Sequence, residues 1–249
     1  MCAARASGVP VGPAWIIAPA AGRGAFETAR THQADVALVD LEDSLAHDLK
    51  QAGRERAEQI FAGPTAGPGA LGIRINPLTG ADAVRDLMAL DRCAAKPDVI
   101  LVPKVESARD VEVVAGCLDG AGYAPRIYAL LETPKGVEKA SSIVKAKRLA
   151  GLFFGAGDYA KCLGCDLDWS SLLYARSRVV ACAAEAGLPA LDAPFFDTED
   201  LAGLRQEAER GRALGFSGKM AVHPRQLPVI TTVFRPAPPD GAPPLPWER

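Results

Sequence analysis

The sequence has no long apolar run and almost no net charge. No stretch approaches about 20 uninterrupted apolar residues, so we expect no membrane-spanning helix. The 28 Lys and Arg residues nearly balance the 30 Asp and Glu residues, which leaves a formal net charge of −2 at pH 7. Such a balance gives no electrostatic footprint for a nucleic acid or an anionic membrane surface. We therefore expect neither as a partner.

Histidines and familiar catalytic motifs are also scarce. The chain has only three histidines, too few for a histidine-rich metal site. It contains no G-x-S-x-G nucleophile motif, no HExxH zinc motif and no Walker phosphate loop. The chemistry that these motifs carry is therefore not expected.

Cysteine is too sparse for a disulfide framework, because six cysteines are spread over 249 residues. Cys162 and Cys165 have CxxC spacing, but no second CxxC or nearby histidine completes a tetrahedral zinc site. We interpret the cysteines as reduced thiols of a cytoplasmic protein. The N-terminal "MCAARASGVPVGPAWIIAPA" is interpreted as a lead-in to a first strand and not as a signal peptide.

Short apolar runs alternate with helical patterns along the rest of the chain. We expect strands at Trp15–Ala18, Val36–Leu41, Leu71–Ile75, Asp98–Val102, Arg126–Leu131, Gly151–Phe154, Ala190–Asp192 and Lys219–Val222. We expect helices at Ala25–His32, Lys50–Phe61, Asp82–Arg92, Ser107–Leu118, Gly136–Lys147, Leu172–Ala186 and Thr198–Leu214. Near-continuous apolar strands between helices indicate a parallel sheet covered on both faces. Eight such units in 249 residues predict a (β/α)8 TIM barrel, with an open doubly wound sheet as the alternative.

We expect a single barrel domain over residues 1–236 and an extended Pro-rich tail over residues 237–249. The expected helix boundaries carry suitable capping residues. Ser107 and the pair Asp197 and Thr198 stand where N-caps are needed, and Gly187 and Gly215 follow helices that they can close.

Charged residues follow the expected strands at the end where each strand stops. They are Asp40, Glu42 and Asp43 after the second strand, Arg74 on the third, Lys104 and Glu106 after the fourth, Glu132 after the fifth and Asp158 after the sixth. Active sites of TIM barrels lie at this face. Single pairs, such as Lys104 with Glu106 or Arg74 with Asp40, could be ion pairs that only tie the barrel together. Because five successive strands end in charge, we favour a functional site.

A carboxylate-rich mouth with Arg and Lys suits a hard divalent cation. Mg²⁺, or alternatively Mn²⁺, is bound through carboxylates, waters and substrate oxygens. The turn Gly155-Ala156-Gly157 can present backbone N–H groups to an anion such as a substrate carboxylate. A positive ion among the acidic residues would also explain why Asp40, Glu42 and Asp43 lie so close together.

Six stretches of the chain resemble the citrate lyase β-subunit-like branch (CitE-like) of the HpcH/HpaI aldolase superfamily. They are "DVALVDLEDSLAHDLKQAGRERA", "IRINPL", "DVILVPKVESARDV", "ALLETPKGV", "GLFFGAGDYAKCLG" and "GFSGKMAVHPRQLPVITTVFRP". The resemblance implies a TIM barrel, usually trimeric, that binds one Mg²⁺ and makes or breaks a C–C bond next to a carbonyl. Such relatives include citryl-CoA, malyl-CoA and citramalyl-CoA lyases.

The resemblance also assigns roles to residues. Metal ligands fall on Glu132 and Asp158, and Arg74 matches the Arg that clamps a carboxylate and the developing enolate. We take the catalytic set as Arg74, Glu42, Asp43 and Asp40, with Glu42 or Asp43 as candidates for proton transfer. We take the substrate-binding set as Arg74, Gly155, Ala156, Gly157, Lys104, Thr133 and Pro134.

The first strand departs from the family pattern. Ala14, Ala20, Gly22, Ala25 and Thr28 stand at positions where the family has Arg, Gly, Arg, Arg and Lys, and only Arg23, shifted by one position, remains. The lost basic residues are plausible partners of coenzyme A phosphates, so use of a CoA thioester is weakened. The chain also ends soon after "TTVFRP", where longer relatives continue into a lid, so we do not expect a hydrolytic step that depends on that lid.

Three other readings stay open. The first is a CoA-independent aldolase or a condensing enzyme of a biosynthetic pathway. The second is a Schiff-base aldolase that uses Lys104, although Glu106 nearby would hold that amine protonated. The third is a barrel that binds or assembles without catalysing a reaction.

Overall fold

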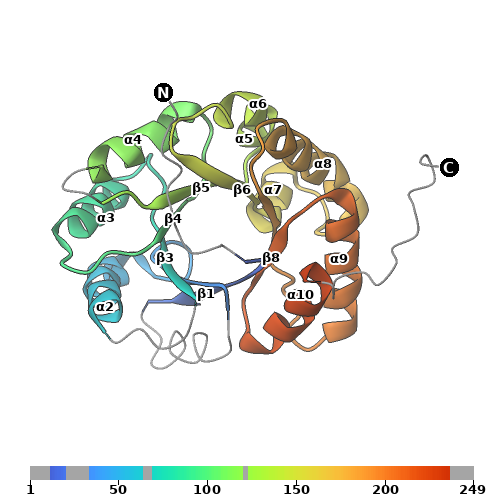
Figure 1. The fold of residues 1–249 in the computed structure, drawn as a ribbon, viewed down its shortest axis with the longest axis horizontal. Coiled ribbons are helices and arrows are strands. Elements are labelled where there is room, and N and C mark those ends of the chain that lie inside the picture. Colours follow the sequence, from blue (N-terminus) through green and yellow to red (C-terminus); the bar gives the residue numbers. More distant parts are fainter. Residues whose placement is uncertain (1–11, 21–33, 64–68, 120–122, 236–249) are drawn as a thin grey trace.

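The computed structural model describes residues 12–20, 34–63, 69–119 and 123–235. Eight parallel strands close into a barrel in chain order, with helices around the outside (Figure 1). The strands are β1 (Ala14–Pro19), β2 (Val36–Asp40), β3 (Ala70–Arg74), β4 (Val99–Val102), β5 (Arg126–Leu131), β6 (Leu149–Phe154), β7 (Ala190–Asp192) and β8 (Gly218–Ala221). Because β1 pairs with both β2 and β8, the predicted TIM barrel is confirmed and the open sheet was the wrong alternative.

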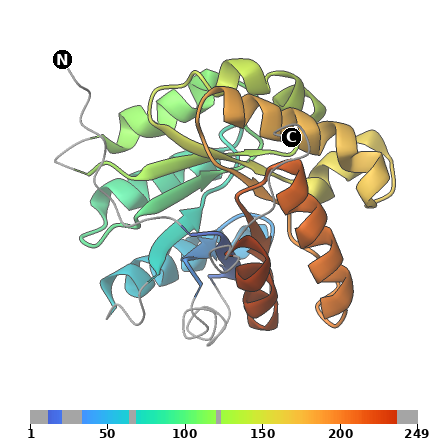
Figure 2. The ribbon, with the colours of Figure 1, turned by 45° about the vertical axis from the view of Figure 1, so that its right-hand side comes forward.

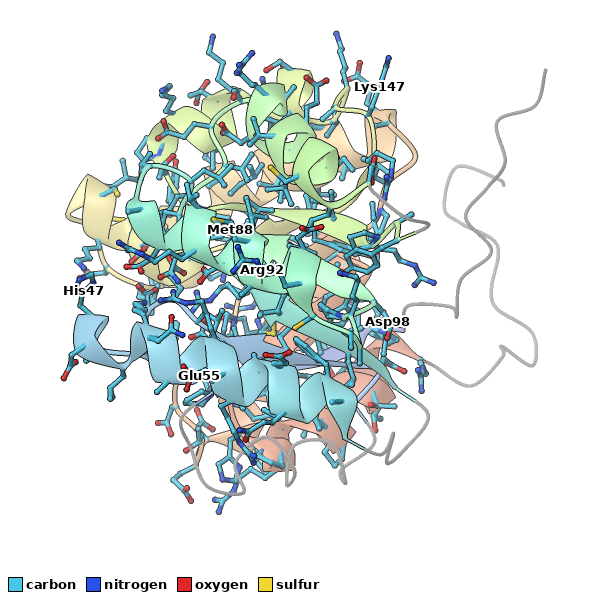
Figure 3. All side chains as sticks on the ribbon, turned by 90° about the vertical axis from the view of Figure 1, so that its left-hand side faces the viewer. His47, Glu55, Met88, Arg92, Asp98 and Lys147 are labelled. Carbon is cyan, nitrogen blue, oxygen red and sulfur yellow. The ribbon has the colours of Figure 1, made fainter. Side chains whose placement is uncertain are left out.

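The helices of the described residues are η1 (His47–Leu49), α2 (Lys50–Ala62), α3 (Ala81–Arg92), α4 (Ala108–Leu118), α5 (Pro134–Glu138), α6 (Ala140–Ile143), α7 (Ala156–Leu163), α8 (Trp169–Glu185), α9 (Leu201–Leu214), η2 (Pro224–Gln226) and α10 (Leu227–Phe234). Figure 2 shows α9 and α10 side by side at the orange-to-red end of the chain. Figure 3 looks onto α2 and α3, which also pack together, with Glu55 and Arg92 on their exposed faces. The helix expected at Ala25–His32 and the tail over 237–249 lie outside the described residues.

Strand side chains alternate between two apolar layers, as the pleat requires. One layer contains only strand residues and so fills the barrel interior: Trp15, Val36, Leu38, Ala70, Val99, Leu101, Tyr128, Leu130, Phe153, Leu191 and Met220. The intervening residues pack outward against the helices. Inside the barrel, the Trp15 ring meets Tyr128 and Phe153 edge-on, with ring centroids 4.8 and 4.9 Å apart. These three rings pack together in the interior of the barrel.

Capping residues set several helix ends. Ser107 is the N-cap of α4, and its N–H donates to Asp110 Oδ2 at 2.9 Å. Gly187 and Gly215 follow α8 and α9 with φ of +66° and +115°, the left-handed region that glycine adopts without strain. The N-cap predicted for the helix before Gly215 is wrong. Asp197 accepts the N–H of Glu199 in a preceding turn, so Asp200 caps α9 instead.

The single helix expected over Gly136–Lys147 is replaced by the two short helices α5 and α6. Ser142 Oγ donates to the carbonyl of Lys139 at 2.8 Å, a local bond that competes with continuous helix. Two helices were missed. The glycines at the start of α7 were read as a turn, and no helix was expected at α10, whose β-branched residues have a weak intrinsic preference for helix. Packing of α10 on β1, β8 and α9 overrides that local preference.

A buried ion network joins β7 and β8 to the helices outside them. Asp192 ends β7, but its carboxylate turns outward, where Lys219 Nζ donates to it at 2.8 Å and Arg176 Nε at 3.0 Å. Lys219 also donates to Glu207 at 2.6 Å. Each buried charge in this network has an opposite charge beside it, the condition that burial demands. Asp192 therefore fixes the scaffold and does not point into the barrel mouth. No helix of the described residues is long and apolar enough to cross a membrane.

Candidate active site

A cavity of about 470 Å³ opens at the ends of the strands. In Figure 3 this end carries His47, and Asp98, which precedes β4, lies at the opposite end of the barrel. The polar residues of the cavity wall are Asp40, Asp43, Ser44, Arg74, Glu132 and Asp158, and the remaining ones are Ile17, Ala18, Leu101, Leu130, Gly155, Gly157, Pro194, Phe196, Met220 and Val222. Five predicted charged residues from β2, β3, β5 and β6 thus face one space.

Asp40 and Arg74 form the first charged pair of the site. The Arg74 guanidinium donates through Nε and Nη2 to the two carboxylate oxygens of Asp40, each at 2.7 Å. Burial works to raise the pKa of Asp40, but these bonds and the charge of Arg74 outweigh it and lower the pKa. The ion pair considered from the sequence is confirmed. In this geometry Asp40 bonds to Nε and Nη2 of Arg74, and Nη1 is directed to other partners.

Nη1 of Arg74 points to the other two acidic residues after β2. It lies 2.9 Å from Glu42 Oε2 and 3.7 Å from Asp43 Oδ2. Asp43 is well exposed and lines the cavity, whereas Glu42 is buried. Burial raises the pKa of Glu42 against the opposing charges of Arg74 and Lys104. Asp43 therefore faces the cavity directly, and Glu42 stands behind Arg74.

Two contacts fix the backbone around these side chains. Lys50 Nζ donates to the carbonyl oxygens of Leu41 and Glu42 at 2.7 and 2.6 Å, so the first turn of α2 holds the acidic loop. After β3, the N–H and the side-chain amide of Asn76 donate to buried Asp86 at 2.8 and 2.7 Å. The chain segments on both sides of the Asp40–Arg74 pair are thus anchored to helices.

Glu132 follows β5 and is 4% exposed. Its Oε1 accepts the backbone N–H of Lys104 at 3.0 Å. Burial raises the pKa of Glu132 to about 8, and the negative charges of Glu42 and Asp158 add to this against Arg74 and Lys104. A Cβ at Gly155 would lie 2.8 Å from Glu132 Oε2, so only glycine allows β6 to pass this close. A bound cation would stabilise the charged form of a carboxylate that is buried among other negative charges in this way.

Lys104 contacts three carboxylates, that of Glu132 through its backbone N–H and two others through its ammonium group. Its Nζ donates to Glu42 Oε1 at 2.6 Å and lies 3.0 Å from Asp158 Oδ2. These contacts raise its pKa, although burial alone would lower it. The predicted pairing of Lys104 with Glu106 is wrong. Glu106 instead accepts hydrogen bonds from Lys135 Nζ at 2.7 Å and from Thr133 Oγ1 at 3.0 Å. Lys104 is held as an ammonium ion by a different set of acids, which disfavours a Schiff-base role.

The remaining predicted binding residues separate into two groups. Gly155 and Gly157 line the cavity, with Gly155 as the N-cap of α7 and the others in its first turn, so the predicted turn is a helix start. Ala156 is buried. Thr133 caps α5 by accepting the N–H of Gly136 at 3.0 Å, and Pro134 begins that helix. Within the described chain, Thr133 and Pro134 do not line the cavity.

The residue set fits Mg²⁺ or Mn²⁺ with two protein ligands. Glu132 and Asp158 both face the cavity, and five carboxylates stand against the two cations Arg74 and Lys104. Across the described ranges, no three His, Cys, Asp or Glu side chains converge as a metal cage. Mg²⁺ usually takes one or two carboxylates and completes its shell with water and substrate. Cys162 and Cys165, the other pair considered, are free thiols on and just after α7.

The sequence reasoning missed the apolar part of the cavity. Ile17, Leu101, Leu130 and Met220 belong to the strand positions that face the barrel interior, a pattern readable from the strand alternation. Phe196, in the loop after β7, is 53% exposed at the cavity wall, and no sequence signal identifies it. The wall of the site therefore combines charged residues at the strand ends with apolar residues of the barrel interior and of one loop.

Comparisons of the sequence and of the structure with known proteins lead to the same family. Residues 16–224 match the family model described as HpcH/HpaI aldolase/citrate lyase. A (3S)-malyl-CoA thioesterase of Cereibacter sphaeroides is 35% identical over 222 residues, 88% of this chain and 76% of the relative. The Mycobacterium tuberculosis citrate lyase β subunit complexed with oxaloacetate and magnesium is similar with a TM-score of 0.78 and 32% identity, covering 91% of this chain and 98% of that one. CitE of that organism in complex with magnesium, acetoacetate and coenzyme A has a TM-score of 0.77 and 32% identity, over 91% and 82% of the two chains.

Proposed function

The chain belongs to the HpcH/HpaI aldolase/citrate lyase family, and we propose that it is a Mg²⁺-dependent carbon–carbon lyase. Its substrate is a hydroxy- or oxo-carboxylate or the corresponding CoA thioester, of the citryl-CoA or malyl-CoA kind. The observation that carries this proposal is the placement of Glu132 and Asp158 beside Arg74 in one cavity at the strand ends. The relatives in complex with magnesium and small oxo-acids support it.

Glu132 and Asp158 would hold the metal ion, which supplies Lewis-acid polarisation of the substrate carbonyl when bound. Arg74 is positioned to donate from Nη1 to the oxygen on which negative charge develops. Asp40 orients that guanidinium through its two bonds to Nε and Nη2. Asp43, which faces the cavity, is the better placed of the two candidates for proton transfer.

Atoms and electrons balance in the proposed reaction when Asp43 carries the proton. In the cleavage direction, the carboxylate of Asp43 accepts the proton of the substrate hydroxyl. The adjacent C–C bond then breaks, the hydroxyl carbon becomes a carbonyl, and the electron pair of that bond passes to the enolate of the other fragment. The enolate carbon takes the proton back from Asp43. The same steps in reverse form the bond, so the site serves either direction.

A CoA-independent aldolase is the second candidate, favoured by the first strand. Ala14, which stands where the family has Arg, is buried and supplies no phosphate contact, and Ala20, where the family has Gly, is also buried. The other departures, at Gly22, Ala25 and Thr28, and the retained Arg23 lie outside the described residues.

Calorimetric titration in the presence of Mg²⁺ distinguishes the candidates. We expect coenzyme A or acetyl-CoA to bind if the chain is an acyl-CoA lyase, and only pyruvate or oxaloacetate to bind if it is a CoA-independent aldolase. Glu132→Ala is the control and is expected to lose Mg²⁺-dependent binding of the keto acids. Absence of binding by all four compounds would contradict citryl-CoA-like and malyl-CoA-like substrates and leave either an unusual biosynthetic substrate or the non-catalytic barrel.

We further propose a homotrimer, as the family resemblance implies, and a cytoplasmic location, in keeping with the free thiols of Cys93, Cys117, Cys162, Cys165 and Cys182. Light scattering after gel filtration is expected to give three times the chain mass of 26.1 kDa. A mass equal to one chain would contradict the trimer.

A further inference from the structure

Lys104 has an unusual backbone for a long side chain. It follows β4 and has a φ of +51°, in the left-handed region. Residues other than Gly, Asn and Asp rarely adopt this region. In this conformation its N–H donates to Glu132 Oε1 at 3.0 Å. A glycine would adopt the same backbone without strain, so what Lys104 adds to this position is its ammonium group.

The ammonium group approaches the other proposed metal ligand. Nζ of Lys104 lies 3.0 Å from Asp158 Oδ2, while Glu42 Oε1 accepts a hydrogen bond from it at 2.6 Å. Glu42 is buried and in turn contacts Arg74, so the ammonium group is tied to the rigid part of the site. Lys104 therefore contacts one oxygen of Glu132 through its backbone and one oxygen of Asp158 through its side chain.

The position of Lys104 relative to the cavity decides what these contacts do. Glu132 and Asp158 are part of the cavity wall, whereas within the described chain Lys104 and Glu42 are not. The contacts of Lys104 with the two carboxylates thus come from a residue outside the set that lines the cavity. Each contact engages one carboxylate oxygen, Oε1 of Glu132 and Oδ2 of Asp158, and so restricts how that carboxylate can turn.

We propose that Lys104 is a positioning residue that orients both Glu132 and Asp158 for a divalent cation, one through its backbone N–H and the other through its ammonium group. The inference rests on the proposed function, because it takes Glu132 and Asp158 as the metal ligands. Groups that orient metal ligands from outside the coordination shell commonly contribute 10- to 100-fold to metal affinity. Lys104 would contribute in this way without touching the metal or the substrate.

Titration calorimetry of the metal-free protein with MgCl2, and separately with MnCl2, tests this assignment. Lys104→Met removes the ammonium group, and we expect it to weaken binding of the metal by about 10- to 100-fold. Lys104→Gly keeps the N–H bond to Glu132 and relaxes the backbone, so we expect a similar loss with an intact fold. Lys104→Arg restores a cation and is expected to recover part of the affinity.

Lys135→Met is the matched control, because Lys135 pairs with Glu106 away from the cavity. It is expected to leave the metal affinity unchanged. Unchanged affinity for the metal in both Lys104→Met and Lys104→Gly would overturn this inference and leave the proposed function standing. Tighter binding would also overturn it and would show that the ammonium group competes with the metal. If the wild-type chain bound neither Mg²⁺ nor Mn²⁺, the proposed function and this inference would both fall.

Discussion

Replacing Arg74 by lysine is expected to lower kcat by about 10²- to 10³-fold, the usual effect of losing one donor to a developing oxyanion. The guanidinium serves Asp40 through Nε and Nη2, and its Nη1, which lies 2.9 Å from Glu42 Oε2, has a second N–H to offer the substrate. A lysine has a single nitrogen, which cannot satisfy buried Asp40 and an enolate oxygen together. The effect should appear in kcat with whichever substrate the binding measurements identify.

Lysine is preferred to methionine at this position because it keeps the positive charge. Loss of the charge would leave Asp40 and Glu42 buried without Arg74, at a cost of about 3–5 kcal/mol in the free energy of unfolding. Arg85→Lys, on the exposed face of α3, is the control and should retain full turnover. If Arg74→Lys kept wild-type kcat while still binding Mg²⁺, Arg74 would not act on the reacting atoms.

Replacing Glu132 by glutamine is expected to abolish Mg²⁺ binding and to stabilise the metal-free protein. Burial, with help from Glu42 and Asp158, raises the pKa of this carboxyl to about 8 from an ordinary value of 4.5. Between these two values the folded protein holds a proton that the unfolded chain has lost. The free energy of unfolding therefore falls as the pH rises, by up to about 1.4 kcal/mol per pH unit.

Thermal melts of the metal-free proteins at about pH 6 and about pH 9 measure this difference. Glutamine has no proton to lose, so the melting temperature of the variant should fall less over this range than that of the wild type. Mg²⁺ should raise the melting temperature of the wild type more at the higher pH, because the ion competes with the proton for Glu132. In Glu132→Gln the ion should have no effect.

Glu55→Gln is the matched control, since Glu55 lies on the exposed face of α2 (Figure 3). It should show the wild-type pH dependence and the wild-type response to Mg²⁺. An equal decline of the melting temperature in wild type and Glu132→Gln would show that Glu132 is ionised throughout in the metal-free protein. Its assignment as the buried, cation-seeking carboxylate would then be wrong.

The barrel and the polar face of the site could be predicted because both follow from local sequence. Apolar strands of three to six residues recur between helices, and parallel strands in a barrel end at one face. Arg74, Glu132 and Asp158 each lie at a strand end or within a few residues of one. Their convergence therefore required only the order and direction of the strands.

Partner choice inside the site could not be predicted in the same way. Lys104 and Glu106 are two residues apart, yet Lys104 bonds Glu42 and Asp158 from other strands, because its left-handed backbone sets the direction of its side chain. The apolar residue Phe196 comes from a loop whose course depends on tertiary packing. Helix α10 formed against its local preference for the same reason.

The three aromatic rings of Trp15, Tyr128 and Phe153 have a consequence for how a substrate lies in the barrel. They belong to the same interior layer as Ile17, Leu101, Leu130 and Met220, which line the cavity, so within the described chain the substrate approaches an apolar layer that the rings continue. A product fragment that leaves the charged strand ends for this layer exchanges polar contacts for apolar ones, so the polar end of each fragment is expected to stay at the mouth of the barrel.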